Sequence, residues 1–278
     1  MSLMPQDKFI FFGTPSVARD TLAVLLENGF VPRAVVTSPD APKGRGLSLA
    51  PSPVKELALA RHIPVMTPAQ LDAETISEIK SEECDYAVVV AYGKIFPAEL
   101  ISIFPKGVLN IHYSLLPKHR GAIPVEAALL AGDTETGVTI QTMVREVDAG
   151  DILAQEKTVI ASNETARELR ARLIPLGARL LVATLPLYLN NEITPLAQDS
   201  LQVSKEWRMN KEDGLLRLDA PAEENWRKYR AYADSIGTYF FENEKRMKIT
   251  RAEFAKGEFR VLRVIPEGKS ETDYRPSR

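Results

Sequence analysis

The chain has 278 residues, of which 45% are hydrophobic, enough to bury a substantial core in one long domain or two shorter ones. Its 35 Lys and Arg residues nearly balance its 37 Asp and Glu residues, so the net charge of −2 neither favours nor excludes a nucleic-acid partner. The single cysteine, Cys84, excludes an internal disulfide framework and a cysteine-based zinc site, and it fits a reducing compartment. We expect a cytoplasmic protein with no membrane partner, because the sequence shows neither a signal-like N-terminal segment nor an apolar run of about 18 residues.

The first third of the chain alternates short apolar runs with amphipathic stretches. This alternation predicts right-handed crossovers and a parallel sheet, whose binding crevice lies at the carboxyl ends of its strands. Thr14 is a candidate cap, and Pro15 a candidate first residue, for the first helix. The turn before it has only Gly13 where a dinucleotide site needs G-x-G-x-x-G, so we do not expect a nicotinamide cofactor. The expected strands are 8–12, 33–37, 63–65 and 85–91, and the expected helices are 15–27, 53–61 and 68–80.

Residues 38–53 are rich in proline and contain two glycines, a composition that predicts a long loop. Lys43 and Arg45 lie beside these glycines and could pair with phosphates or reach base edges of a nucleic acid. A solvated basic turn is the alternative interpretation.

Polar residues interrupt the apolar run that follows Gly107. Asn110 and His112 alternate with Leu109 and Ile111, so a strand through them places the amide and the imidazole on one face. Burying such side chains is costly unless partners or a substrate meet them. Residues 114–121 then read as a loop, and Pro124 opens a helix through Leu130.

The second half of the chain predicts a hairpin, a long helix and a small β-rich domain. Strands 137–144 and 151–160 enclose a turn with Asp148, and the helix after 162–165 is expected to break near Pro175. We assign residues 1–189 to a catalytic domain and the polar stretch 190–206 to a linker. Residues 207–278 carry 16 Lys and Arg against 13 Asp and Glu, and their short strands fit a small barrel.

One set of motifs resembles a known family. Asn110-x-His112-x-Ser114-Leu-Leu-Pro117, followed 36 residues after His112 by Asp148 in Val147-Asp-Ala-Gly-Asp151, is similar to the signature of 10-formyltetrahydrofolate-dependent formyltransferases. The resemblance implies an α/β fold: a Rossmann-like, mostly parallel sheet, followed by a reduced OB-like β-barrel. It also implies 10-formyltetrahydrofolate as formyl donor and no metal.

The family reaction moves a formyl group to an amine through a tetrahedral intermediate, whose oxygen carries the developing charge. By resemblance, Asn110 and His112 supply hydrogen-bond donors to that oxygen, and loss of one such donor typically costs about 10²- to 10³-fold in rate. Asp148 then orients the imidazole and accepts, directly or through water, the proton of the attacking amine.

Family likeness also implies the binding residues. Backbone hydrogen bonds and an apolar slot would hold the folate. The folate contacts are expected at Tyr92, Gly93, Ile95, Ser114, Leu115, Leu116, Pro117, Val144 and Glu146. The contacts to the amine substrate are expected at Gly13, Thr14, Val17, Lys43 and Arg45.

The Pro-Lys-Gly-Arg-Gly loop at 42–46, the Pro-Ser-Pro-Val-Lys motif at 51–55 and the basic C-terminal part resemble methionyl-tRNA formyltransferases. This implies a monomer that acts on the α-amine of methionine on initiator tRNA, in translation initiation. An N-formyltransferase for a nucleotide-linked amino sugar shares the chemistry and is the alternative. Glycinamide ribonucleotide transformylase fits less well because it is usually a single domain near 200 residues. An RNA-binding module with a vestigial catalytic domain is the non-enzymatic possibility.

Overall fold

The computed structural model describes residues 7–43, 48–206 and 208–275. Contacts between Cα atoms divide the chain into two compact units, each built from three separate stretches. The first unit comprises residues up to 118, 137–156 and 173–203, and the second comprises 119–136, 157–172 and 204–278. The domain boundaries at 190 and 207 stay a prediction about sequence segments.

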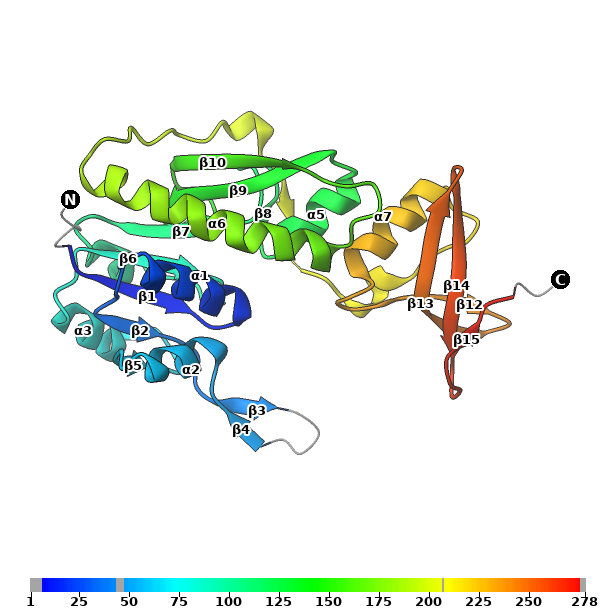
Figure 1. Cartoon of the computed structure of the whole chain (residues 1–278), viewed down its shortest axis with the longest axis horizontal. Helices are drawn as coiled ribbons and strands as arrows, with labels where there is room; N and C mark the ends of the chain where they lie inside the picture. The colour runs from blue at the N-terminus through cyan, green and yellow to red at the C-terminus, as the bar shows by residue number, and fades with distance from the viewer. Residues whose placement is uncertain (1–6, 44–47, 207, 276–278) are drawn as a thin grey trace. The chain divides into compact units, whose positions relative to one another are not determined.

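A seven-stranded sheet organises the first part of the chain (Figure 1). Its strand order is β10-β9-β7-β6-β1-β2-β5, in which the neighbours from β7 to β5 are parallel and β9 runs antiparallel to β7. The predicted mostly parallel α/β sheet is therefore confirmed. Its strands are β1 (Phe9–Gly13), β2 (Ala34–Val36), β5 (Val65–Met66), β6 (Tyr86–Val90), β7 (Val108–His112), β9 (Glu135–Thr142) and β10 (Ile152–Val159).

Seven α-helices connect or cover the strands among the residues that the structure describes. Three of them begin with side-chain caps, because Ser52 accepts from the backbone N–H of Lys55, Asp72 from that of Thr75 and Thr165 from that of Glu168. The predicted cap at Thr14 is wrong: Pro15 occupies the cap position, without a side-chain hydrogen bond. The helices are α1 (Ser16–Glu27), α2 (Pro53–Ala60), α3 (Ala73–Ser81), α4 (Ala98–Ser102), α5 (Pro124–Ala131), α6 (Ala166–Leu189) and α7 (Ala222–Tyr232).

Helix α6 runs unbroken through Pro175, so the predicted interruption there is wrong. A proline inside a helix removes one backbone hydrogen bond, but packing against the sheet holds this helix together. A Cβ atom added at Gly177 would lie 3.0 Å from side-chain atoms of both Ile111 and Val138, which shows how closely the helix approaches the strands. In length and composition α6 also resembles a membrane-spanning helix, whereas its buried Leu173, Leu181 and Leu185 are typical of a core helix.

The two faces of the sheet have different partners. Strand register places Phe12, Val89 and Asn110 on one face, and Leu109 and Ile111 on the other. The first face packs against α3, α4 and the segment between β6 and α4. Its core consists of Ile10, Phe12, Val36, Ile79, Cys84, Ala87, Val89, Tyr92, Phe96, Leu100, Phe104 and Val108. The polar end of β7 therefore continues an apolar face.

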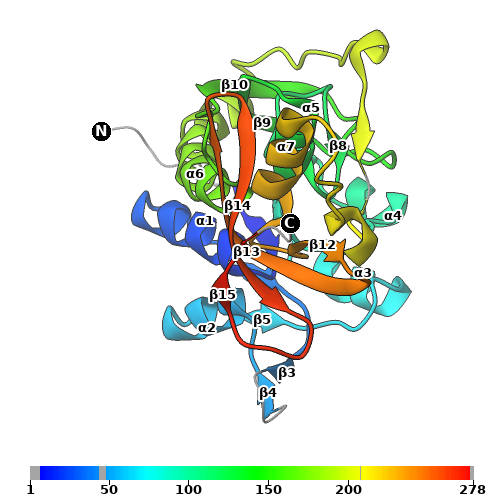
Figure 2. The same ribbon diagram turned by 90° about the vertical axis from the view of Figure 1, so that its right-hand side faces the viewer.

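The segment between β2 and α2 contains a short hairpin, β3 (Ala41–Lys43) with β4 (Ser48–Ala50), where the sequence predicts only loop. Antiparallel pairing of Lys43 with Ser48 closes it. The hairpin extends beyond the β5 edge of the sheet in both ribbon views (Figures 1 and 2).

The second unit contains a four-stranded sheet in the linear order β12-β13-β14-β15. Its strands are β12 (Thr238–Glu242), β13 (Lys245–Ala255), β14 (Glu258–Pro266) and β15 (Thr272–Asp273). One face packs on α7 through a core of Leu216, Tyr229, Phe240, Ile249 and Val264. The expected reduced barrel is an open antiparallel sheet. The same unit contains a two-stranded parallel pair, β8 (Arg120–Gly121) with β11 (Lys205–Glu206). Two short 3-10 helices flank β11 in the sequence: η1 (Ser200–Gln202), which belongs to the first unit, and η2 (Lys211–Gly214), which belongs to the second.

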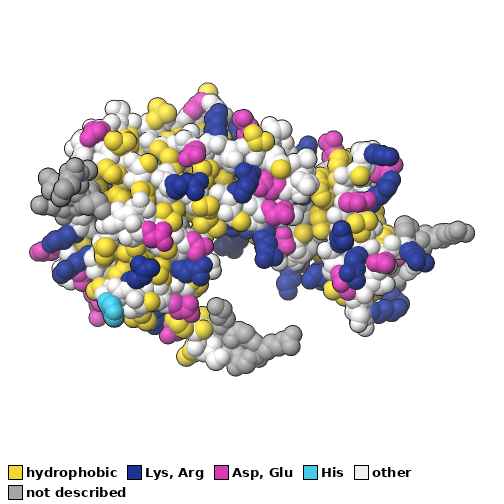
Figure 3. Space-filling model, viewed as in Figure 1, with side chains coloured by type: hydrophobic (Ala, Val, Ile, Leu, Met, Phe, Trp, Pro, Cys, Tyr) yellow, Lys and Arg dark blue, Asp and Glu magenta, His cyan; other side chains and the backbone are white. Residues whose placement is uncertain are grey.

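The opposite face of this sheet is basic. Tyr239 and Phe241 lie across from Lys248 and Arg246 in the register of β12 and β13, so these four side chains share one face. The guanidinium of Arg246 lies 3.9 Å from the centroid of the Tyr239 ring, a cation–π contact. Over this sheet, Figure 3 shows Lys and Arg side chains interspersed with Asp and Glu side chains. We give the name outer basic face to Arg246, Lys248 and Arg251, three exposed basic residues of β13, of which Arg251 lies where the strand register is irregular.

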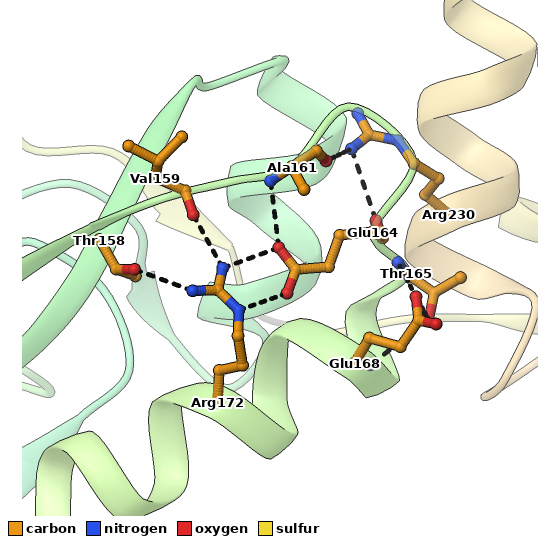
Figure 4. Close-up of polar contacts among 8 residues, drawn as sticks. All are labelled: Thr158, Val159, Ala161, Glu164, Thr165, Glu168, Arg172 and Arg230. Carbon is orange, nitrogen blue, oxygen red and sulfur yellow. Dashed lines mark hydrogen bonds and ion pairs between the residues drawn. The ribbon is translucent and has the colours of Figure 1, made fainter.

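Polar contacts tie the start of α6 to its surroundings in the second unit (Figure 4). Arg172 donates to both carboxylate oxygens of Glu164, at 2.6 and 2.8 Å. Arg230 of α7 donates to the carbonyl oxygens of Ala161 and Glu164 at 3.3 and 3.5 Å. Thr165 and Glu168 form a capping box, as the expected cap at 162–165 requires, and the Thr165 hydrogen bonds lower the pKa of Glu168.

Candidate active site

The polar end of β7 and the turn between β9 and β10 meet. His112 Nδ1 lies 3.4 Å from Asp148 Oδ1, and Asn110 Nδ2 donates to the same oxygen at 3.5 Å. The side chains of His112 and Asp148 are only 6% and 10% exposed. The structure thus brings together the three residues that the sequence proposes as catalytic.

Two further polar residues, both missed by the sequence analysis, come from β9. Thr139 lies opposite His112, and Gln141 lies opposite Asn110. Residues opposite each other on antiparallel strands share a face, so Gln141 also reaches Asp148 and donates to Oδ1 at 2.8 Å. Alternation along 137–144 groups Thr139 with Gln141, but only the register with β7 shows what they face.

The Asp148 turn has a backbone that its surroundings hold in place. Asp148 has a φ of 52°, in the left-handed region that costs a non-glycine residue about 1–2 kcal/mol. Thr142 N–H donates to Asp151 O at 2.9 Å, and Asp151 N–H donates to Thr142 Oγ1 at 3.0 Å. A Cβ atom added at Gly150 would lie 1.8 Å from Thr142 O, so only glycine fits there.

Gln198, in the segment expected to be a linker, also contacts this turn. Its Nε2 donates to Asp148 O at 2.8 Å and to Gly150 O at 2.7 Å. The segment is fixed beside the turn by two backbone hydrogen bonds between Leu196 and Ile152. No sequence pattern in 190–206 signals this contact.

The loop after His112 is held by hydrogen bonds from side chains of β9 and β10. Thr139 Oγ1 donates to Ser114 O at 2.7 Å and accepts from Leu116 N–H at 3.1 Å. Gln155 Nε2 donates to Leu116 O at 2.8 Å, and the peptide between Leu116 and Pro117 is cis. Ser114 and Leu116 are buried, so this loop presents an ordered backbone next to the imidazole.

The remaining residues expected to bind folate differ in exposure. Tyr92 is buried, and burial raises its pKa to about 12, so its hydroxyl stays protonated. Ile95 and Val144 are 79% and 44% exposed and offer apolar surface to a ligand. Glu146 is exposed beside Val144. These assignments stay predictions.

The first strand-to-helix turn is closely packed. A Cβ atom at Gly13 would lie 2.6 Å from the Ala18 Cβ, so Gly13 is explained by packing. Thr14 Oγ1 lies 3.1 Å from Ser38 Oγ, and Val17 is half-buried on α1. Binding roles for these residues stay predictions.

The basic loop lies partly beyond what the structure describes. Lys43 contributes its backbone to β3, but its side chain and the whole of Arg45 lie outside the described residues. Their expected role toward nucleic acid therefore stays a prediction.

This arrangement suits proton transfer and charge stabilisation. Asn110 and His112 place two potential donors on one face, and the carboxylate of Asp148 lies within reach of both. Among the described residues, no three His, Cys, Asp or Glu side chains come together as metal ligands.

Comparison with known proteins identifies two family models along the chain. Residues 7–185 match the formyl transferase model, and residues 208–266 match the formyl transferase C-terminal domain model. The methionyl-tRNA formyltransferase of Myxococcus xanthus (strain DK1622) is 39% identical over 266 residues, which cover 95% of this chain and 85% of that protein. The methionyl-tRNA formyltransferase of Thermus thermophilus is 42% identical over 262 residues, covering 93% and 85%.

Solved structures share the fold. The N-formyltransferase of Helicobacter canadensis, in complex with folinic acid and dTDP-3-aminofucose, matches with a TM-score of 0.70 and 22% identity, over 90% of this chain and 88% of that one. HypX of Aquifex aeolicus, in complex with tetrahydrofolic acid, matches with a TM-score of 0.64 and 13% identity, over 96% of this chain and 46% of that one. From the matches along its own sequence, the chain belongs to the formyl transferase family and is an enzyme of that family.

Proposed function

We propose that the protein transfers the formyl group of 10-formyltetrahydrofolate to the α-amine of methionine on initiator tRNA. The observation that carries this proposal is the convergence of Asn110, His112 and Asp148 in a chain whose relatives, at 39% and 42% identity, are methionyl-tRNA formyltransferases. We further propose that the protein is cytoplasmic, because translation initiation requires no membrane. We also propose that it acts as a monomer.

In the proposed reaction Asn110 and His112 act as donors to the formyl oxygen. The neutral amine attacks the formyl carbon, the carbonyl oxygen gains negative charge, and both donors stabilise it. His112 approaches Asp148 through Nδ1, an arrangement that fixes the plane of the ring. Asp148 accepts the proton that the attacking nitrogen loses, directly or through water. The intermediate then collapses: the bond between the formyl carbon and N10 of the donor breaks, N10 takes up a proton, and tetrahydrofolate leaves.

The proposed folate site lies around the loop after His112. Thr139 and Gln155 fix the carbonyl oxygens of Ser114 and Leu116, and the second lone pair of each oxygen suits the polar edge of a pterin. Exposed Ile95 and Val144 suit its apolar face. The remaining proposed contacts are Tyr92, Gly93, Leu115, Pro117 and Glu146.

The proposed tRNA contacts lie at three places in the sequence. Lys43 and Arg45 flank a glycine in the loop 42–46, where they would pair with phosphates, and Gly13, Thr14 and Val17 would lie toward the amino acid. The outer basic face would add sequence-independent contacts to the sugar–phosphate backbone.

The test is formylation by the purified protein with 10-formyltetrahydrofolate as donor. We expect formyl-methionyl-tRNA from charged initiator tRNA, and a lower rate with charged elongator tRNA. A dTDP-linked amino sugar serves as the competing acceptor. Efficient formylation of that sugar, with none of the methionyl-tRNA, would contradict the proposed acceptor while keeping the chemistry.

A further inference from the structure

Gln198 places one amide group among three oxygen atoms next to the candidate site. Its Nε2 lies 2.8 Å from Asp148 O, 2.7 Å from Gly150 O and 3.4 Å from Gln141 Oε1. A carboxamide nitrogen carries two hydrogens and no acceptor lone pair, so it suits this position, and a carboxamide oxygen does not.

The orientation of Gln198 also determines that of Gln141. Because the Gln198 amide nitrogen faces Gln141 Oε1, the Gln141 nitrogen turns to Asp148 and donates to Oδ1 at 2.8 Å. The reverse orientation of Gln141 would bring its oxygen against the Asp148 carboxylate. The amides of Gln198 and Gln141 therefore form a chain of hydrogen bonds from the Asp148 carbonyl oxygen to the Asp148 carboxylate. Hydrogen bonds in such a chain polarise and strengthen one another.

We propose that Gln198 is a positioning residue, which acts through Gln141 and the Asp148 turn to hold the Asp148 carboxylate beside Asn110 and His112. This inference rests on the proposed function, in which that carboxylate accepts a proton. The left-handed backbone at Asp148 needs external support, and Gln198 binds carbonyl oxygens on both sides of Ala149.

The backbone on either side of Gln198 is itself fixed. Leu196 exchanges two hydrogen bonds with Ile152, at 2.8 and 2.9 Å, directly after the turn. Asp199 accepts from Leu201 N–H at 3.0 Å, which caps η1. The glutamine side chain therefore reaches the turn from a segment that is anchored to the same hairpin.

The first test compares Gln198→Ala with Gln202→Ala. Gln202 is the matched control, because it is a glutamine of the same segment whose amide donates to exposed Asp199 at 2.9 Å. We expect Gln198→Ala to lower kcat by about 10- to 100-fold, since small displacements of a reacting group cost rates of that order, with KM for tRNA changed less than about threefold. Gln202→Ala should match the wild type. Equal kcat values for the two variants overturn the proposal.

The second variant, Gln198→Glu, tests the need for a donor. An ionised carboxylate there opposes three oxygen atoms, whereas the protonated acid can donate one hydrogen bond. At pH 7.5 the introduced carboxylate is ionised, so kcat of Gln198→Glu should be no higher than that of Gln198→Ala. Wild-type kcat in Gln198→Glu, in a variant that stays folded by circular dichroism, overturns the proposal.

Hydrogen exchange separates this inference from the proposed function. Peptides covering 144–151 should exchange faster in Gln198→Ala than in the wild type or Gln202→Ala, whatever the acceptor is. Unchanged exchange overturns the positioning role. Failure of the wild-type protein to formylate methionyl-tRNA instead overturns the proposed function, and it leaves the exchange result to decide about Gln198.

Discussion

A single carboxylate oxygen, Oδ1 of Asp148, lies within 3.5 Å of donors on Asn110, His112 and Gln141. Three residues on two adjacent strands thus converge on one atom of a residue from a turn. Small changes at this atom should therefore affect the reaction more than the fold, because the strands themselves are fixed by the core.

We expect Asp148→Asn to reduce kcat by about 10²- to 10⁴-fold, because the amide cannot accept the proton of the attacking amine. The melting temperature should stay close to that of the wild type, since asparagine also tolerates a left-handed backbone. Single-turnover formylation and thermal unfolding measure the two effects. Asp151→Asn, an exposed acid of the same hairpin, is the control. Equal rates for both variants would assign Asp148 a role outside the chemistry.

Cys84 should react slowly with thiol reagents. Burial raises the pKa of this thiol from 9.0 to about 11, so at pH 8 the thiolate fraction falls about 100-fold. Because the pKa is raised, the rate of alkylation should keep increasing with pH up to about 11. Mass spectrometry after iodoacetamide treatment, in buffer and in urea, measures the difference. Similar rates in both conditions would show that the thiol is accessible.

At the scale of elements, periodicity predicted which side chains of one strand share a face. It missed the contacts between residues of different segments. Alternation along β7 correctly placed Asn110 and His112 on one face. Gln141 became visible only through the pairing of β9 with β7, and Gln198 only through the return of the chain after α6. The break expected at Pro175 was wrong because tertiary packing overrides the local preference of proline.

The start of α6 offers a stability prediction. Arg172→Ala leaves the carboxylate of Glu164, which is 8% exposed, without its bidentate partner. We expect a loss of about 1–3 kcal/mol in the free energy of unfolding, the usual cost of an unsatisfied buried group. Arg167→Ala, an exposed arginine on the same helix, should change it by less than about 0.5 kcal/mol. Urea unfolding measures both, and equal losses would contradict the importance of the contacts in Figure 4.

For the whole molecule, the sequence predicted the individual sheets and the hairpin better than the way in which they combine into compact units. The parallel sheet, the hairpin around Asp148 and the C-terminal strands follow from local patterns. The division into two interleaved units does not, because it depends on contacts between stretches far apart in the sequence. Within the second unit, for example, Trp226 Nε1 donates to Ser162 O at 2.9 Å.

This organisation favours point substitutions over truncation for testing the C-terminal sheet. The double variant Lys248→Glu/Arg251→Glu changes only exposed positions of the outer basic face. We expect it to weaken tRNA binding at least about tenfold at low salt and to reduce the salt slope by about 2, because about 0.9 counterions are released per phosphate contact. KM for the folate should not change.

Filter binding at several salt concentrations measures this effect. Arg61→Glu/Lys80→Glu, at two exposed positions outside the outer basic face, is the control because it changes the net charge by the same amount. An unchanged salt slope in the double variant would remove the outer basic face from the proposed tRNA contacts.

The interleaving of the two units also constrains how the protein is made. Residues 119–136 leave the ribosome well before residues 204–278, with which they form one compact unit. At about 5–20 residues per second, the nascent chain exposes α5 for several seconds before α7 exists to cover it. The second unit can therefore complete its folding only once residues 204–278 have left the ribosome, and until then its unpaired apolar surface is exposed to aggregation.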